Sequence, residues 1–246
     1  MKFFFHLGRY FELIKLVFSR PEKAKIYFKQ TIKEIEVIGI NSLGIVFVIS
    51  IFMGAVLTLQ VGYNFDSPLI PRYLIGLSAR DSMILEFSST IVGLILAGKV
   101  GSHIASEIAT MRVKEQIDAL EIMGINSAGY LIFPKIIAAV FINPFLTMIS
   151  SFVGIFGGWL AAIATGVVSS NEYIHGLHYA FVPFYMTYAL IKAVVFAFII
   201  TSVSAYHGYY TKGGALEVGH SSTKAVVYSS VLILLFNVIL TQLLLA

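Results

Sequence analysis

The chain has 246 residues, of which 58% are hydrophobic and only 12% charged, and its mean hydropathy is +0.87. Soluble domains carry about 25% charged residues, so the composition indicates a membrane protein. The formal net charge of +4 comes from few, scattered basic residues, which argues against nucleic-acid binding. The chain has no cysteine, so disulfides and thiolate metal sites are excluded.

The first 36 residues are expected to form an interfacial segment ahead of the membrane spans. Charged residues interrupt any continuous apolar run, so a signal peptide is not expected. Apolar residues nevertheless recur at helical spacing, at Phe3, Leu7, Phe11, Ile14 and Phe18. This pattern is typical of a helix lying in the membrane interface, with a buried helix of a soluble protein as the alternative. Pro21 is expected to end this helix, and a polar approach segment follows.

Five apolar segments are long enough to cross a bilayer, which takes about 20 residues. Their approximate ranges are 38–63, 83–101, 128–168, 184–206 and 225–246. Lys and Arg are concentrated in the stretch before the first segment, 1–36, and in two stretches between segments, 99–135 and 207–224. They are outweighed by acidic residues at 64–86 and absent from 168–184.

The distribution of basic residues predicts the topology. By the positive-inside rule the three basic stretches are cytoplasmic and the other two lie outside. The segment 128–168, long enough for two crossings, must then cross once. We therefore predict an all-α polytopic membrane protein in which residues 1–246 form one domain, with a five-span bundle over 37–246. Its N-terminus is expected to be cytoplasmic and its C-terminus periplasmic, in the inner membrane.

Small residues recur at four-residue steps within the spans, at Gly93, Ala97, Gly101, Ala105 and Ala109, and again at Gly154, Gly158 and Ala162. Such stripes let helices approach closely in lipid, and the lining of a substrate path is the alternative. The run Gly93 to Val100 resembles a P-loop but lacks its final Ser or Thr and follows no strand. The chain is therefore not expected to hydrolyse ATP, and no catalytic or metal site is predicted.

One polar stretch, Ser102 to Met123, interrupts the apolar segments. It carries six charged residues, each of which would be costly in hydrocarbon, while its apolar residues recur with helical spacing. We predict an amphipathic helix that ends at Gly124 and offers a docking surface to a soluble partner. Two further ionisable residues, Glu86 and Lys192, lie in apolar surroundings, where such groups usually face a bundle interior or a wet cavity.

Four motifs in this chain resemble those of MlaE/YrbE-type permeases, the membrane subunits of ABC lipid transporters that work with MCE-domain proteins. They are Gly54 to Gln60 (GAVLTLQ), Leu96 to Ile108 (LAGKVGSHIASEI), Met111 to Asn126 (MRVKEQIDALEIMGIN) and Gly213 to Ser230 (GGALEVGHSSTKAVVYSS). The last resembles the glycine-rich inner loop of the family. The resemblance implies an interfacial helix plus five spans, the topology that the charges also predict.

The resemblance further implies a homodimer that binds membrane lipid, two ABC ATPase subunits that carry the ATP and Mg²⁺, and an MCE-domain partner. It assigns ATPase coupling to Glu107, Met111, Arg112, Glu115, Gln116, Asp118 and Leu120, and a lipid cavity to Leu57, Gln60, Glu86 and Lys192. The expected cargo is a phospholipid or related lipid. A sterol-like cargo and a non-transporting scaffold are the alternatives. A secondary transporter is disfavoured, because no internal repeat is found.

The sequence departs from the family pattern at two places. Family members typically carry Arg-Glu-Leu-Gly-Pro at the start of the second span, where Leu85 to Ser89 of this chain retain only Glu86. They also carry a proline where this chain has Ser127. The first departure lies near the expected lipid cavity, so we expect a difference in lipid preference rather than in coupling.

Overall fold

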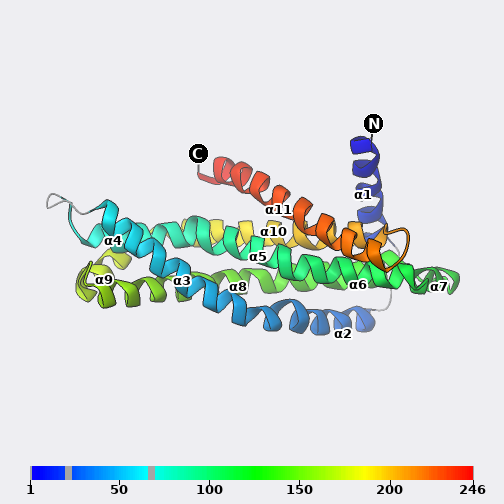
Figure 1. Ribbon diagram of the computed structural model, residues 1–246, viewed down its shortest axis with the longest axis horizontal. Helices are drawn as coiled ribbons and strands as arrows, with labels where there is room; N and C mark the ends of the chain where they lie inside the picture. Colours follow the sequence, from blue (N-terminus) through cyan, green and yellow to red (C-terminus); the bar gives the residue numbers. More distant parts are fainter. Residues whose placement is uncertain (1, 20–23, 66–69, 246) are drawn as a thin grey trace. The chain divides into compact units, whose positions relative to one another are not determined.

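The computed structural model describes residues 2–19, 24–65 and 70–245, and every regular element within them is helical. Five helical stretches are long and apolar enough to cross a membrane (Figure 1). They are Lys25–Asn64, Tyr73–Val113, Ser127–Thr165, Phe184–Tyr209 and Ala215–Leu245. The predicted all-α polytopic membrane fold is confirmed. The predicted helix end at Pro21 lies outside the described residues.

The helices follow in chain order, with π-helical segments marked η. They are α1 (Lys2–Phe18), α2 (Ala24–Ile35), η1 (Glu36–Ile40), α3 (Asn41–Asn64), α4 (Tyr73–Ser82), η2 (Met83–Ile91), α5 (Val92–Leu96), η3 (Ala97–Gly101), α6 (Ser102–Val113), α7 (Gln116–Ile122), α8 (Ser127–Thr165), α9 (Ser170–His178), α10 (Phe184–Tyr209) and α11 (Ala215–Leu245). The third apolar segment is one continuous helix, α8, as the charge distribution predicts.

Two stretches expected to be loops are partly helical. The start of the glycine-rich motif is non-helical only up to Gly214, and α11 begins at Ala215, so the expected loop is much shorter than the motif. Between α8 and α10, α9 begins with a capping box in which Ser169 and Glu172 bond each other's backbone N–H groups. The Ser169 hydroxyl also donates a hydrogen bond to the Glu172 carboxylate at 2.6 Å. This bond and the one from the Ser169 N–H lower the pKa of Glu172, because both favour its charged form.

Contacts divide the chain into two compact units. The first comprises residues 1–42, 93–143 and 194–246, and the second residues 43–92 and 144–193. In the first unit α11 packs along α6, as Figure 1 shows. A Cβ added to Gly101 would lie 2.9 Å from Ser204 Oγ, and one added to Gly208 would lie 2.7 Å from the Ala105 carbonyl oxygen. The small-residue stripe at this end therefore packs against α10.

In the second unit, α4 packs against α9. Arg80 is buried and donates hydrogen bonds to the carbonyl oxygens of Leu177 (2.7 Å) and Tyr179 (2.9 Å) at the end of α9. A Cβ on Gly54 would collide with the Gly154 backbone, so these two glycines bring α3 and α8 into backbone contact. The second glycine stripe thus has the packing role predicted for it.

Helix α1 lies against α10, where Tyr10 donates a hydrogen bond to Ser202 Oγ at 2.7 Å. Its buried face is formed by Leu13 and Val17, which the periodicity did not single out. Phe11 and Phe18, by contrast, are exposed. An exposed apolar stripe opposite a packed face is the arrangement expected of a helix that lies in a membrane interface.

Candidate functional site

The sequence predicts one helix over Ser102 to Met123, but this polar stretch forms two. Helix α6 ends at Val113 and α7 begins at Gln116, with Glu115 between them in a left-handed conformation (φ 58°). A non-glycine residue in this conformation is strained by about 1 kcal/mol or more. The predicted stop at Gly124 is confirmed by its φ of 77°.

The break allows two charged side chains to meet. The guanidinium Nη1 of Arg112, in α6, lies 2.6 Å from Oδ1 of Asp118, in α7. Residues six positions apart point in different directions on a continuous helix, so this ion pair requires the turn at Glu115. The Arg112 guanidinium also lies 5.3 Å from the centre of the Tyr209 ring. Arg112 and Asp118, both assigned to ATPase coupling, therefore join α6 to α7. We call these two helices and the turn between them, residues 102–123, the α6–α7 corner.

A hydrogen-bonded triad ties α7 to the spans. Tyr209, in the last turn of α10, donates a hydrogen bond to the carboxylate of Glu121 at 3.0 Å, and its hydroxyl lies 2.8 Å from Oγ of Ser127. Ser127 donates in turn to Glu121 at 2.9 Å. The sequence analysis noted Ser127 only as a missing proline, and it missed the other two residues. The serine hydroxyl links α8 to this triad in a way that a proline could not.

A second cluster lies farther along α6. The ammonium of Lys135, in α8, is 2.6 Å from a carboxylate oxygen of Glu34 in α2 and 2.6 Å from one of Glu107 in α6. Only 5% of the Lys135 side chain is exposed. Glu107, assigned to ATPase coupling, therefore also holds three helices together. The cluster was not predicted, because its members lie far apart in the chain.

The remaining coupling candidates differ in exposure. Helix α7 packs on the fully buried Ile117, while Met111 and Leu120 are half-buried. The exposed members are Glu115, Gln116 and Asp118. Beyond them, Ile122 is 87% and Met123 65% exposed. The corner thus presents two large apolar side chains next to a charged surface, a combination typical of protein docking sites.

The two ionisable residues of the apolar segments lie together in the second unit. The ammonium of Lys192, whose side chain is completely buried, is 3.0 Å from the carboxylate of Glu86. It also donates to the Tyr188 hydroxyl at 2.9 Å and to the Leu85 carbonyl oxygen at 3.2 Å. Tyr188 donates to Glu86 at 3.2 Å. The buried charge is therefore compensated by one anion and two neutral acceptors.

Glu86 lies in η2, a π-helical segment of nine residues. Such segments are rare and frequently occur at functional sites. The Glu86 side chain is 38% exposed, so it connects the buried ammonium to the surface of the chain. The other two cavity candidates lie on α3, where Leu57 is buried and Gln60 is exposed.

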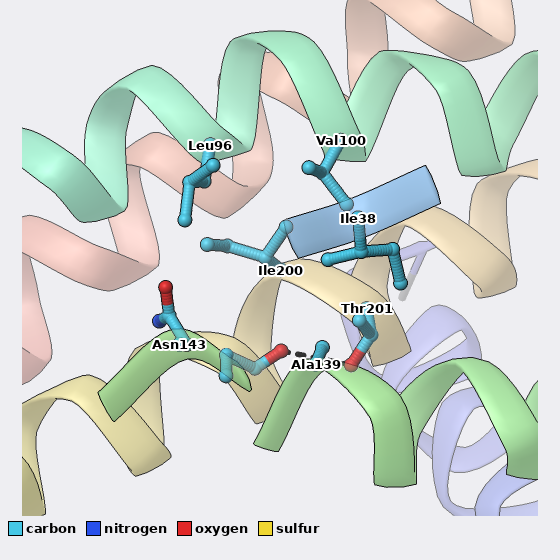
Figure 2. A pocket seen from close by; sticks show the side chains of 8 residues that line it. Ile38, Leu96, Val100, Ala139, Asn143, Ile200 and Thr201 are labelled. Atoms are coloured by element: carbon cyan, nitrogen blue, oxygen red, sulfur yellow. Dashed lines mark hydrogen bonds between the residues drawn. The ribbon is translucent and has the colours of Figure 1, made fainter. Parts of the chain in front are cut away.

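A small cavity in the first unit is too narrow for a lipid. Its volume is about 10 Å³, which is room for about one water molecule. Figure 2 shows its lining, in which Thr201 uses its hydroxyl to bond the Ala197 carbonyl oxygen at 2.8 Å. The lining residues are Ile38, Leu96, Val100, Ala139, Asn143, Ala197, Ile200 and Thr201. None of the four cavity candidates is among them.

Comparisons with known proteins agree with the geometry. The chain is 40% identical over 218 residues to a probable ABC transporter permease protein of Rickettsia bellii, an alignment that covers 89% of this chain and 84% of that protein. It is 36% identical over 226 residues to protein TRIGALACTOSYLDIACYLGLYCEROL 1, chloroplastic, of Arabidopsis thaliana, covering 92% of this chain and 64% of that protein.

A probable ABC transporter permease protein of Synechocystis is 32% identical over 234 residues, covering 95% of this chain and 88% of that protein. A family model described as Permease MlaE matches residues 31–243, which is most of the chain and leaves out only the first residues of the first candidate span and the last residues of the fifth. This chain belongs to the MlaE permease family.

Proposed function

We propose that this chain is the permease subunit of an ABC transporter that moves phospholipid or a related lipid between the inner membrane and an MCE-domain partner. A separate ATPase binds the ATP and Mg²⁺. The observation that carries the proposal is the α6–α7 corner, which presents an exposed apolar tip and is bonded to two spans. The permease names of the relatives support an ATPase partner.

The corner provides a physical route for coupling. When the ATPase closes on ATP, the contacts that it makes with Ile122 and Met123 differ between its open and closed states, and only such a difference can shift the permease between conformations. The triad of Glu121, Ser127 and Tyr209 bonds α7 to the start of α8 and the end of α10. A displacement of α7 is therefore transmitted to both spans.

The Glu86–Lys192 pair is our candidate for the site that meets the lipid headgroup. The ammonium of Lys192 is fully buried, so its role is to hold the Glu86 carboxylate in place, and Glu86 is the member of the pair that a lipid can reach. The partly exposed carboxylate of Glu86 can then contact a cationic headgroup. The name of the Arabidopsis relative contains that of a glycolipid, which supports a lipid cargo. A sterol-like cargo or a non-transporting scaffold are the alternatives.

The proposed assembly is a homodimer, in which Leu57 and Gln60 of each copy contribute to a shared lipid cavity. Helix α11 has a surface that a second copy or lipid can cover, because only 11% of its most apolar stretch is buried within the chain. Large apolar residues such as Val231, Val238 and Leu243 are exposed along it. A two-fold dimer is the commonest homo-oligomer, and in it residues 1–246 act as one permease domain.

The proposal is tested by affinity purification from the native membrane in mild detergent. We expect an ABC ATPase to co-purify with the wild type and to be lost from Ile122→Asp/Met123→Asp. Tyr63→Asp is the control, because Tyr63 is 79% exposed and is the last residue of the first predicted span, at the end predicted to face outside. A wild type that brings down no ATPase, or a double variant that retains it fully, would contradict the proposal.

A further inference from the structure

A groove with a volume of about 390 Å³ lies beside α2, far in sequence from the Glu86–Lys192 pair. Its lining residues are Lys25, Ile26, Lys29, Gln30 and Tyr130. We propose that this groove holds the headgroup of an anionic phospholipid of the phosphatidylglycerol type. This lipid is a resident of the site and not the transported cargo.

The charge of the groove matches a phosphate. Lys25 and Lys29 are four residues apart and therefore share one face of α2. Both are exposed, and no described carboxylate forms an ion pair with either of them. Tyr130 adds a phenol hydroxyl from α8. Two ammonium groups and a hydroxyl provide hydrogen-bond donors with which to surround a phosphate group.

Gln30 indicates a headgroup that carries hydroxyls. Its Oε1 atom is buried and accepts no hydrogen bond within the described part of the chain. A buried acceptor without a donor costs about 1–3 kcal/mol. The glycerol hydroxyls of phosphatidylglycerol can donate a hydrogen bond to Oε1, whereas the choline of phosphatidylcholine has no N–H or O–H group with which to donate one.

The groove lies next to the helix that we assign to the membrane interface. The ring of Phe133 is 5.7 Å from that of Phe18, at the end of α1, and 5.1 Å from that of Tyr27, in the first turn of α2. Phe133 follows Tyr130 by one helical turn on α8. The C-terminal end of α1 and the N-terminal end of α2 thus meet beside the groove. The exposed apolar face of α1 places this region at the level of the lipid headgroups.

Apolar side chains continue from the groove along α2. Ile26, which lines it, is 39% exposed, and Ile32 is 52% exposed. Ile32 is seven residues after Lys25 and three after Lys29, so it lies on the face of the two lysines. An acyl chain leaving the headgroup can cover this surface. A basic groove that continues into an apolar face at the interface fits an anionic lipid.

Native mass spectrometry of the purified full-length protein tests the proposal, in detergent containing equal amounts of phosphatidylglycerol and phosphatidylcholine. We expect the wild type to retain phosphatidylglycerol in preference to phosphatidylcholine. In Lys25→Gln/Lys29→Gln the ratio of bound phosphatidylglycerol to phosphatidylcholine should fall about 30-fold, because two charges near an anionic lipid are removed. Lys212→Gln/Lys224→Gln is the matched control, since it also removes two exposed lysines and neither of them lines the groove. Lys25→Arg/Lys29→Arg should retain the lipid.

Gln30→Leu should lower the preference for phosphatidylglycerol over phosphatidic acid, which lacks the glycerol hydroxyls. The proposal is overturned if Lys25→Gln/Lys29→Gln loses no more lipid than Lys212→Gln/Lys224→Gln. It is also overturned if inorganic phosphate displaces the lipid from the wild type, because the groove would then be a site for a soluble anion. The experiment needs neither an ATPase nor transport, so either outcome leaves the proposed function to be judged separately.

Discussion

The ammonium of Lys192 lies 3.0 Å from the carboxylate of Glu86, although the two residues are 106 positions apart in the chain. The sequence identifies each only as a lone ionisable residue in apolar surroundings. In the structure they neutralise each other, and Tyr188 bonds both. A charge at this depth is costly unless it is paired, so the pairing explains how Lys192 can be fully buried.

Glu86→Gln should destabilise the protein strongly, because it leaves the buried ammonium of Lys192 without an anion. Removal of one partner of a buried pair costs about 3–5 kcal/mol of unfolding free energy, and the partial exposure of Glu86 places the effect at the lower end. Thermal unfolding in detergent measures it. The double variant Glu86→Gln/Lys192→Met should recover most of the loss. Equal melting temperatures for Glu86→Gln and the wild type would contradict the pairing.

Tyr188→Phe is a milder variant at the same place. It removes one neutral acceptor from Lys192 but leaves the ion pair, so we expect the free energy of unfolding to fall by only about 1 kcal/mol.

If the pair also meets the lipid headgroup, lipid transport by Glu86→Gln/Lys192→Met should fall even though its stability recovers. Normal transport by this double variant would separate the pair from the lipid site.

Arg112→Glu should uncouple lipid-stimulated ATP hydrolysis from the permease while the protein still inserts and folds. The change places two carboxylates, those of residues 112 and 118, on facing sides of the α6–α7 corner, so they repel each other. The charge-reversed variant Arg112→Glu/Asp118→Arg restores the attraction and should regain much of the coupling. If the reversed pair is as inactive as the single variant, Arg112 acts through the partner and not through Asp118.

Lys135→Met should loosen the attachment of α2 to α6 and α8. The substitution leaves Glu34 and Glu107 close together without a cation, and we expect a loss of about 3 kcal/mol. Neutralising both acids, in Lys135→Met/Glu34→Gln/Glu107→Gln, should return most of the stability. Unfolding temperatures of the three proteins provide the measurement, and an unchanged value for Lys135→Met would show that the cluster holds nothing together.

The predicted topology can be tested directly, because the chain has no native cysteine. A cysteine in place of Asn171 should react with a membrane-impermeant thiol reagent added outside the cell. One in place of Lys114 or Gly213 should be protected until the membrane is opened. Labelling at Gly213 in intact cells would overturn the five-span orientation.

The all-α class and the number of candidate spans could be predicted from the sequence, because both depend on local composition. The single crossing of α8 followed from the absence of Lys and Arg over 168–184 together with the basic residues before it. The stripes of small residues could likewise be assigned to packing, since their four-residue spacing is itself the signal. These features need no knowledge of which residues meet across the fold.

The turn at Glu115 and the side-chain clusters could not be predicted in this way. Glutamate carries no turn signal, and the left-handed conformation of Glu115 (φ 58°) is uncommon for a residue other than glycine. The bonds of Tyr209 to Glu121 and Ser127 join residues more than 80 positions apart in the chain. Which polar residues meet is decided by the packing of the helices, and a single sequence does not reveal that packing.

The central claim is that this permease moves lipid when an ATPase acts on its α6–α7 corner. The most direct measurement is ATP-dependent movement of a labelled phospholipid out of proteoliposomes that contain the permease and its co-purified ATPase, with the MCE-domain partner as acceptor or donor. The account predicts movement that requires ATP and is lost in Ile122→Asp/Met123→Asp. Movement that is independent of ATP, or equal in the wild type and this variant, would contradict it.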